Sequence, residues 1–329
     1  MTNSLRIGVD LGGTKLAAGL VDDQGNVLHA VRWSERVSDY GAAVDAIAKL
    51  TSQLRERAQR WNRAVDGVGV AVAAHLDRDR TAVLHAPYLD WRDHPLRTDL
   101  QTVIDLEVVL ANDGDAAAWG EYLYGAGAGS PNLIVVTVGT GVGAGLVVDG
   151  RLVQGTRGLA GEIGHVCVVP DGAPCVCGGR GCLERYASGT ALTREARRMA
   201  RERPEDAAGL LDQVSQDAAA IQGRHVLAAA ERGDVVALQA FEEVGRWLGY
   251  ALAQVATVFD PDTILLSGGL AGAREIILAP TRTSFERHVG LPAVRAIPSI
   301  GLGAFWDHAA VPGAAALAAS AIASRRPGW

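Results

Sequence analysis

The stretch Ile7–Asp22, IGVDLGGTKLAAGLVD, recurs in altered form at Ile134–Asp149, IVVTVGTGVGAGLVVD. Each copy reads as an apolar strand, a turn rich in glycine and threonine, and a second apolar strand. An internal repeat of an α/β unit predicts two similar domains that face one another across a cleft. The repeat therefore sets the expected architecture, an α/β protein of two related domains.

The segments around the two copies follow an α/β pattern. Three short strands are expected to form an antiparallel meander at the start of the chain, over 5–9, 16–21 and 27–33. Further strands are expected at 65–74, 107–111, 263–266 and 293–297, and the segment 86–95 reads as irregular. Helical periodicity predicts helices at 40–61, 98–104, 113–124, 190–203, 225–232, 235–259, 274–289 with a break at Pro280, and 310–325.

Length and composition indicate a well-cored protein. The 329 residues suit two domains of about 100 to 200 residues each, and 48% of them are hydrophobic. No apolar run approaches the roughly 20 residues of a membrane span, and a net charge of −6 argues against a nucleic-acid surface. We therefore expect a cytoplasmic protein with neither a membrane nor a nucleic-acid partner.

No low-complexity linker divides the chain, so the domain junction is expected inside a compact connection near Asn112. The expected small α/β domain comprises residues 1–111 with 306–329. The expected large α/β domain comprises residues 112–305 and carries every cysteine of the chain.

The four cysteines lie within Gly161–Glu184, GEIGHVCVVPDGAPCVCGGRGCLE. Three of them stand among glycines in a tight knuckle whose thiolates can converge on a tetrahedral zinc ion: Cys175, Cys177 and Cys182. The fourth ligand is His165 or Cys167, which face the same side of an extended segment because they lie two residues apart. Three thiolates and one further ligand leave no open position, so the zinc is expected to be structural.

A disulfide is the weaker interpretation, because no secretory signal precedes the chain and cytosolic thiols stay reduced. The same loop carries ionisable side chains among glycine and apolar neighbours: Glu162, His165 and Glu184. A zinc ion that fixes the loop would aim these three side chains into one space. Glu162 and His165 also have the Glu-x-x-His spacing of helical di-iron sites, but the glycines Gly161 and Gly164 argue against a helix there.

Three glycine-rich turns end strands, at Asp10–Lys15, Thr137–Gly145 and Ser267–Gly269. Glycine lets backbone N–H groups approach phosphate oxygens closely, although each turn alone also fits a plain tight turn. None is a Walker A loop or a full dinucleotide fingerprint. Together they predict a nucleotide whose phosphates lie between two domains, with Asp10 facing the Mg²⁺ shell. The expected nucleotide-binding residues are Asp10, Gly12, Gly13, Thr14, Lys15, Thr137, Gly139, Thr140, Gly141, Gly143, Gly268 and Gly269.

Asn112 and Asp113 follow the predicted strand at 107–111. Ligands of α/β sheets bind at such carboxyl ends of strands. For the transfer of a phosphate to an alcohol, a protein must take the proton of the hydroxyl, and Asp113 is the expected general base. One of the two residues can instead cap the following helix, which does not exclude catalysis by the other.

Several motifs in combination resemble the ROK family (repressors, open reading frames and sugar kinases). They are Asp10-x-Gly-Gly-Thr-Lys, Asn112-Asp113, Thr137-x-Gly-Thr-Gly-x-Gly, Gly161-Glu-Ile-Gly-His165 and Cys175-x-Cys-Gly-x-x-Gly-Cys-x-Glu184. The resemblance covers nearly the whole chain, and within the family the likeness is to ATP-dependent glucokinases of the actinobacterial type. It implies a two-domain actin-like (ribonuclease-H-like) ATPase fold with a sugar in the interdomain cleft, assembled as a homodimer or homotetramer.

The resemblance also implies a reaction, the transfer of the γ-phosphate of MgATP to the primary hydroxyl of glucose. It makes Asp113 the catalytic base and assigns the sugar hydroxyls to Asn112, Glu162, His165 and Glu184. It assigns a structural zinc ion to His165, Cys175, Cys177 and Cys182. His165 would then bind the metal through one ring nitrogen and face the sugar with the other.

Two departures from the family pattern bear on the acceptor. His75 stands where relatives have glycine, and Tyr88 stands where they have asparagine, in segments that border the sugar pocket of the family. We therefore count His75 and Tyr88 among the expected substrate-binding residues. They motivate an alternative acceptor, another sugar, an N-acylhexosamine or a C7 cyclitol. A third departure, Leu302–Ala309, falls where the family makes a closing contact between its domains.

Other classes of protein are less favoured. A sugar-responsive repressor needs an added helix-turn-helix domain, and Asp10 lies too near Met1 to leave room for one. A sugar sensor without catalysis would not need Asp113, Asp10 and all three glycine turns. A polyphosphate donor is less favoured than ATP.

Overall fold

The computed structural model describes residues 4–13, 15–33, 37 and 39–325. The chain forms two compact units. The first unit comprises Met1–Val135, Ala144–Gly161 and Gly303–Trp329, and the second comprises Val136–Gly143 and Glu162–Leu302. The expected domain junction near Asn112 is a different division of the chain and stays a prediction. Among the described residues, no helix combines the length and hydropathy that a membrane span requires.

The first five-stranded sheet has the order β3-β2-β1-β4-β8. Its strands are β1 (Leu5–Leu11), β2 (Leu16–Val21), β3 (Val27–Arg32), β4 (Val65–Val72) and β8 (Glu107–Asn112). The first three pair antiparallel, which confirms the predicted meander, and β4 lies parallel to both β1 and β8. β1 runs two residues beyond its predicted end, because Asp10 and Leu11 still pair with β2.

The second five-stranded sheet has the order β11-β10-β9-β12-β13. Its strands are β9 (Leu133–Val138), β10 (Val142–Val148), β11 (Arg151–Val153), β12 (Thr263–Ser267) and β13 (Ser299–Leu302). In chain order, both sheets read third, second, first, fourth and fifth strand. The outer pairs also agree, since β2–β3 and β10–β11 are antiparallel while β4–β8 and β12–β13 are parallel. The shared order confirms the internal repeat.

Two strand predictions are wrong. The segment 293–297 is not a strand. Arg295 within it instead donates hydrogen bonds to the Ala256 carbonyl and to the Asp260 carboxylate, at the end of the helix Val235–Phe259. The segment 86–95 is not wholly irregular. Trp91, whose side chain is buried, begins a strand and lies opposite Ala86 of the neighbouring antiparallel strand. That strand completes a small antiparallel sheet of β5 (His75–Leu76), β6 (Val83–Ala86) and β7 (Trp91–His94).

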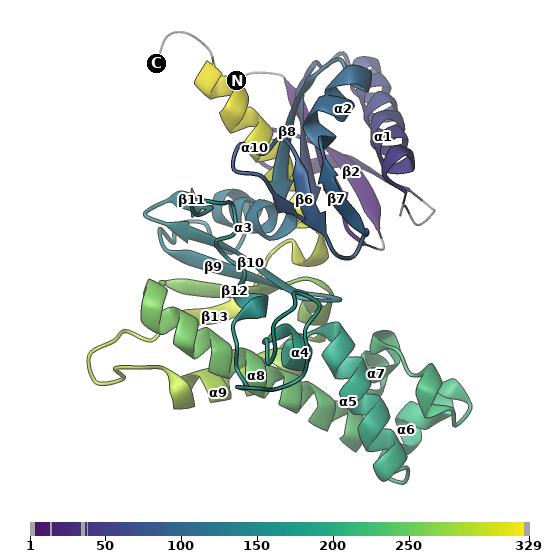
Figure 1. The fold of residues 1–329 in the computed structure, drawn as a ribbon, viewed down its shortest axis with the longest axis vertical. Helices are drawn as coiled ribbons and strands as arrows, with labels where there is room; N and C mark the ends of the chain where they lie inside the picture. The colour runs from purple at the N-terminus through teal and green to yellow at the C-terminus, as the bar shows by residue number, and fades with distance from the viewer. Residues whose placement is uncertain (1–3, 14, 34–36, 38, 326–329) are drawn as a thin grey trace. The chain divides into compact units, whose positions relative to one another are not determined.

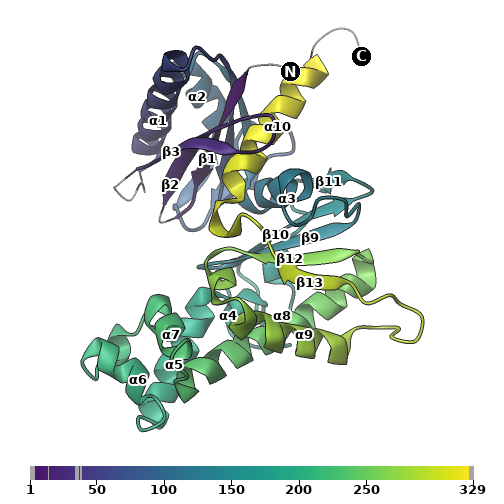
Figure 2. The ribbon, with the colours of Figure 1, turned by 180° about the vertical axis from the view of Figure 1, so that it is seen from behind.

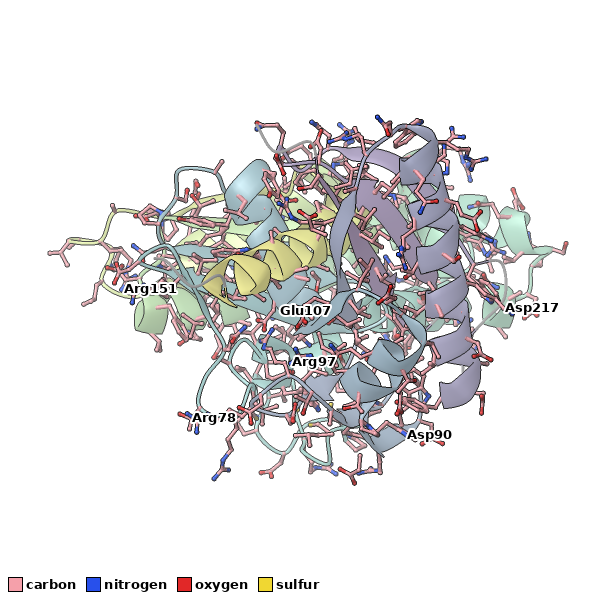
Figure 3. The ribbon with its side chains drawn as sticks, turned by 90° about the horizontal axis from the view of Figure 1, so that it is seen from above. Arg78, Asp90, Arg97, Glu107, Arg151 and Asp217 are labelled. Carbon is pink, nitrogen blue, oxygen red and sulfur yellow. The ribbon has the colours of Figure 1, made fainter. Side chains whose placement is uncertain are left out.

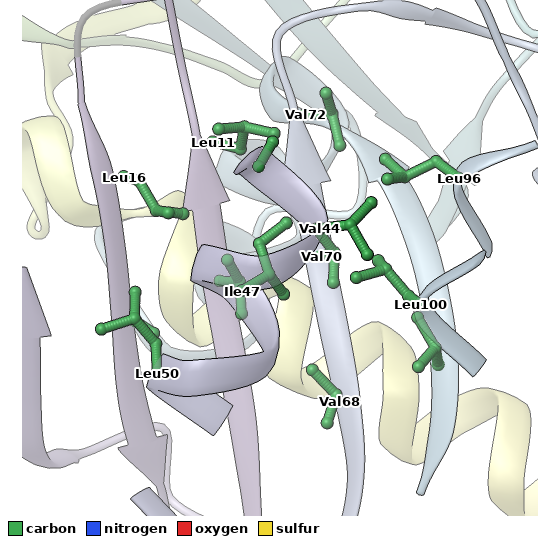
Figure 4. Packing of buried hydrophobic residues seen from close by; sticks show 14 of the residues in the cluster. Leu11, Leu16, Val44, Ile47, Leu50, Val68, Val70, Val72, Leu96 and Leu100 are labelled. Atoms are coloured by element: carbon green, nitrogen blue, oxygen red, sulfur yellow. The ribbon is translucent and has the colours of Figure 1, made fainter. Parts of the chain in front are cut away.

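Helices cover both faces of the first sheet (Figures 1 and 2). They are α1 (Tyr40–Arg60), α2 (Leu96–Val103) and α10 (Ala310–Arg325), with α3 (Asp113–Tyr124) following β8. Val68, Val70 and Val72 of β4 share a buried apolar cluster with α1 and α2, as Figure 4 shows. The alternate residues of the strand point the other way, and Ala71 packs in a cluster with α10. An ion pair of 2.7 Å between Arg97 and Glu107 links α2 to β8 (Figure 3).

The helix α10 approaches the first sheet backbone to backbone. A Cβ atom added at Gly8 of β1 would stand 1.9 Å from the carbonyl oxygen of Val311, and one at Gly69 of β4 would stand 1.8 Å from that of Ala314. Only glycine fits at these two positions. The short side chains of α10 therefore place this helix directly on the sheet.

The second unit adds a helical layer in which the longest helix, α8, lies side by side with α9 (Figures 1 and 2). Its helices are α4 (Glu184–Ala187), α5 (Gly189–Glu202), α6 (Ala208–Leu211), α7 (Gly223–Ala230), α8 (Val235–Phe259) and α9 (Glu275–His288). The predicted break at Pro280 does not occur, since α9 continues through it. Gly245 of α8 makes room for the proline ring, because a Cβ atom there would stand 2.6 Å from Pro280 Cγ.

A buried carboxylate on α3 holds the connection that leads into α10. The Glu121 side chain is fully buried and accepts hydrogen bonds from the backbone N–H groups of Ala126, Ala304 and Phe305, each at 2.9 Å. The last two donors belong to the segment that departs from the family pattern. Glu121 thus satisfies backbone donors that are otherwise costly to bury.

Glu121→Gln is expected to destabilise the protein by about 2 to 4 kcal/mol, because an amide NH₂ group would face backbone donors in place of one carboxylate oxygen. For a protein of this size, that loss lowers the apparent unfolding temperature by roughly 3 to 6 °C in a thermal scan. The matched control is Glu56→Gln on the exposed face of α1, expected to shift it by no more than about 2 °C. Equal shifts in the two variants would contradict this role of Glu121.

Candidate functional site

The expected functional residues fall into two sets, one in each unit. The first set lies at the carboxyl ends of the parallel strands β1, β4 and β8, which meet at one edge of the first sheet. The register places Asp10 opposite Ala71 and Val72 opposite Asn112. The sheet therefore brings the first glycine turn, the segment after β4 and the Asn112-Asp113 pair to a common edge.

Asp10 is buried at the end of β1 and forms an ion pair with Lys15, Nζ to Oδ2 at 2.8 Å. The turn between these residues is closed by a hydrogen bond of 2.9 Å from Gly12 N–H to the Lys15 carbonyl. Thr14, another expected member of this turn, lies outside the described residues. The cation of Lys15 and the backbone donors of the turn suit an anionic ligand.

Asn112 caps α3. Its Oδ1 accepts from the N–H groups of Gly114 at 2.8 Å and Asp115 at 3.2 Å, and its Nδ2 donates to the Ala74 carbonyl at 3.2 Å. Asp113, half-buried, opens the helix and accepts from Gly114 N–H at 3.0 Å. One of the two residues was expected to cap the helix, and it is Asn112. Asp113 keeps a carboxylate at the positive end of α3.

His75 and Tyr88 both belong to the small sheet or its turns. His75 pairs across β5 and β6 with His85, with ring centroids 6.1 Å apart. Burial lowers the pKa of His85, and the positive charges of Arg92 and His75 lower it further. Tyr88 packs on the first glycine turn, since a Cβ atom added at Gly13 would stand 2.7 Å from Tyr88 Cβ.

One buried ion pair in the first unit was not predicted from the sequence. Arg80, in the turn between β5 and β6, forms an ion pair with Asp115, Nη2 to Oδ2 at 2.5 Å. Asp115 lies two residues after Asp113, so its acidic side chain in the first turn of α3 was a usable signal. Its partner was not predictable, because Arg80 lies 35 residues earlier in the chain.

In the second unit, the second glycine turn meets the start of α5. The N–H of Gly189 donates to the Gly139 carbonyl at 2.8 Å, and the Thr190 hydroxyl donates to the Thr140 carbonyl at 2.8 Å. Gly268, with φ of +83°, lies so close to β9 that an added Cβ atom would stand 2.8 Å from the Val138 carbonyl oxygen. The structure thus gathers the expected residues Thr137, Gly139, Thr140, Gly141, Gly143, Gly268 and Gly269 around β9 and a helix N-terminus, a geometry suited to phosphate.

The loop that carries the residues expected to bind the sugar packs against the start of β10. Glu184 Oε2 accepts from Val142 N–H at 3.1 Å, and an added Cβ atom at Gly164 would stand 2.0 Å from the Val142 carbonyl oxygen. Glu162 precedes a single 3₁₀ turn, Ile163–His165, and its Oε2 lies 3.9 Å from His165 Nε2. The structure therefore brings Glu162 and His165 together and fixes Glu184 on the neighbouring strand.

A compact group of four possible metal ligands lies in the same loop. The ligand atoms of His165, Cys175, Cys177 and Cys182 all lie within 4.8 Å of one another. His165 Nδ1 is 3.7 Å from Cys175 Sγ, and Cys177 Sγ is 3.6 Å from Cys182 Sγ. A tetrahedral zinc site has ligand–ligand edges of about 3.5 to 3.8 Å, so these residues fit a zinc ion. Within the described part of the chain Cys167 is not in this group.

The thiols of this group differ in acidity. Burial raises the pKa of Cys182 to about 12 and also raises the pKa of Cys175. Burial acts on Cys177 in the same sense, but the hydrogen bond from Gly179 N–H, at 3.4 Å, and the neighbouring thiols lower its pKa overall. A cation that binds here has to displace protons from Cys175 and Cys182, whose pKa values are raised.

Two sheets of one strand order, with glycine turns at strand ends and acidic and polar residues beside them, place the protein in the actin-like, ribonuclease-H-like ATPase fold class. The model of the ROK family matches residues 6–321, and the chain belongs to the ROK family. It is 40% identical over 314 residues to a glucokinase of Streptomyces coelicolor, which covers 95% of this chain and 97% of that one.

Two further comparisons agree. A glucokinase of Halalkalibacterium halodurans is 33% identical over 296 residues, covering 89% of this chain and 88% of that one. The crystal structure of a ROK family glucokinase from Streptomyces griseus, in complex with glucose and AMPPNP, superposes with a TM-score of 0.89 at 40% identity, covering 96% of this chain and 100% of that one.

Proposed function

We propose that this protein is an ATP-dependent sugar kinase that transfers the γ-phosphate of MgATP to the primary hydroxyl of glucose. The observation that carries the proposal is the whole-length similarity, at 40% identity, to Streptomyces glucokinases, one of which is in complex with glucose and AMPPNP. The geometry of each unit supports it, since the first presents a carboxylate at a helix start and the second presents a glycine-lined helix N-terminus.

In this proposal Asp113 is the general base. Its carboxylate takes the proton of the sugar hydroxyl while the hydroxyl oxygen bonds to the γ-phosphorus and the bond from that phosphorus to the β–γ bridging oxygen breaks, which leaves ADP. The residues assigned to the sugar hydroxyls are Asn112, Glu162, His165 and Glu184. The three glycine turns hold the phosphates, and Asp10 faces the shell of the Mg²⁺ ion, which would supply positive charge to the phosphates when bound.

We also propose that His165, Cys175, Cys177 and Cys182 hold a structural zinc ion. The distances within this group support it, and so does its number of ligands, since four ligands complete a tetrahedral structural site. His165 turns Nδ1 toward Cys175 and Nε2 toward Glu162. A metal on Nδ1 would therefore fix the ring whose other nitrogen is proposed to face the sugar.

A coupled ADP-release assay tests the function. MgATP is offered with glucose, mannose, N-acetylmannosamine, fructose and a C7 cyclitol, and glucose is expected to give the highest kcat/KM. Turnover of another compound with poor use of glucose would support the second candidate below. The absence of sugar-dependent ADP release across the panel would show the proposal to be wrong.

The second candidate is a kinase of the same family for another sugar or a C7 cyclitol. Tyr88 favours it, because this large side chain packs on the first glycine turn and remains 37% exposed. His75 adds a second bulky group near Asn112, whose amide bonds the preceding residue Ala74. Compared with the glycine and the asparagine of the family pattern, His75 and Tyr88 would change the volume of the sugar pocket and the hydrogen-bonding groups that it offers to an acceptor.

Tyr88→Asn is expected to raise the ratio of kcat/KM for glucose to that for the other acceptors by about 10-fold or more, because pocket contacts of this size discriminate by roughly 10- to 200-fold. Leu84→Asn, at an exposed position of β6, is the matched control and should leave the ratio unchanged. The role of Tyr88 would be contradicted if both variants kept the ratio of the unmodified protein.

The homodimer or homotetramer and the cytoplasmic location expected from the sequence stay predictions. Light scattering of the purified protein measures its mass directly. A mass of one chain at working concentration would contradict the expected assembly.

A further inference from the structure

Arg80 is held by two acceptors in the first unit. Its side chain is 16% exposed and that of Asp115 is 4% exposed, and the pair meets at 2.5 Å. In the amide orientation that satisfies both partners, the Gln154 side-chain oxygen accepts from Arg80 Nη2 at 2.5 Å and Nη1 at 3.0 Å. One guanidinium therefore ties together the β5–β6 turn, the first turn of α3 and the residue that follows β11.

The turn that carries Arg80 is closed by hydrogen bonds to the Asp77 carboxylate. The Asp77 carboxylate accepts from Thr81 N–H at 2.6 Å, from the Thr81 hydroxyl at 2.6 Å and from Ala82 N–H at 3.0 Å. Burial alone would raise the pKa of Asp77, but these hydrogen bonds lower it overall, so the carboxylate is ionised near neutral pH. Arg80 thus projects from a fixed support toward α3.

The burial of this ion pair is better explained by a role in positioning its partners than by a contribution to the stability of the protein. Burying two charges costs desolvation energy that their attraction only roughly repays. The planar guanidinium, in contrast, fixes the direction of each acceptor. The acceptor on α3 is Asp115, two residues after Asp113 and bound through its N–H to Asn112. An anchor at Asp115 constrains the turn that begins at Asp113.

We propose that Arg80 is a positioning residue for the general base, acting through Asp115 to hold the first turn of α3 and with it the carboxylate of Asp113. The inference rests on the proposed kinase function. Asn112 has a separate tether, its hydrogen bond to the Ala74 carbonyl, so it keeps its place without Arg80. Loss of Arg80 should therefore reduce kcat more than it raises the KM for sugar.

The experiment compares four variants: Arg80→Gln, Asp115→Asn, the double variant, and the control Arg6→Gln. Arg6 also forms a partly buried ion pair, 2.9 Å to Asp23 with exposures of 18% and 36%, but it starts from the opposite end of β1. Arg80→Gln is expected to lower kcat by about 10- to 100-fold, since a displacement of about 1 Å costs on this order. Its KM for sugar should change by less than about threefold, whereas Arg6→Gln should keep kcat within about twofold.

The double variant tests whether the effect passes through Asp115. Two residues that act as one unit give non-additive effects, so the double variant should be no slower than Arg80→Gln. Additive losses in log kcat would overturn the proposal, and so would a kcat of Arg80→Gln that equals that of Arg6→Gln. Should Arg80→Gln fail to fold, Arg80→Lys keeps the charge without the fork, and it is expected to lose kcat while its unfolding temperature stays near that of the unmodified protein.

Failure of this inference and failure of the proposed function look different. An unmodified protein without sugar-dependent ADP release refutes the kinase function itself. An active unmodified protein whose Arg80→Gln variant keeps its kcat refutes only the role of Arg80.

Discussion

Asp113→Asn is expected to lower kcat by about 10²- to 10⁴-fold, the contribution typical of a positioned general base. The amide has the size of the carboxylate but cannot take a proton. Asn112 continues to cap α3 through Gly114 and Asp115, so the helix should begin at the same residue. The coupled ADP-release assay measures kcat, and calorimetric titration with the best acceptor measures binding.

Sugar binding should change by less than about tenfold in this variant, because only the proton transfer is lost. Asp105→Asn, an exposed residue between α2 and β8, is the matched control and should retain full activity. Full activity of Asp113→Asn would show that another group takes the proton. Loss of both binding and turnover would instead point to a collapsed helix start.

Removal of one metal ligand is the second change with a large expected effect. Cys177→Ser should abolish binding of the expected single zinc ion per chain, and activity should fall with it because the loop that carries Glu162 and Glu184 loses its support. Structural zinc sites supply apparent binding energies of about 10 kcal/mol or more in small domains, so loss of the ion should also lower the unfolding temperature. Metal analysis of the purified variants measures the zinc content.

Cys167→Ser is the matched control, because Cys167 and Cys177 are both exposed and lie in the same loop. It should retain one zinc ion and full activity, since Cys167 stands outside the group of four. Zinc retained by Cys177→Ser, or lost from Cys167→Ser, would contradict the assignment of the ligands. Full activity of a metal-free protein would show that this loop does not need a metal ion to function.

Local signals predicted much of the fold. The bounds of α8 follow from the residues at its ends: Asp234 accepts from Ala237 N–H at the start, and Asp260 adopts φ of +48° at the end, before Pro261. The repeat of strand, glycine turn and strand likewise predicted two similar α/β units, and the two sheets share one strand order. These features depend on neighbours in the sequence, where composition is informative.

The errors lie where distant residues decide. Pro280 stays helical because Gly245, on another helix, leaves space for its ring. In the candidate site, spacing alone could not choose between His165 and Cys167, whereas the family resemblance implied His165 and the folded loop groups His165 with the three other cysteines. The Arg80–Asp115 pair spans 35 residues and the bond from Ala304 to Glu121 spans 183. No local pattern reports such contacts.

The close packing of α10 on the first sheet affects how the protein can fold during its synthesis. β1 begins at Leu5, but the helix that covers its face begins at Ala310. At about 5 to 20 residues per second, a ribosome needs roughly 15 to 60 seconds to make the chain between them. During that time α10 is not yet available to pack on the glycine-containing face of the nascent sheet. The first unit therefore cannot complete its folding before Ala310–Arg325 has been translated. Chaperone capture should therefore be strongest on ribosome-bound chains that stop short of Ala310.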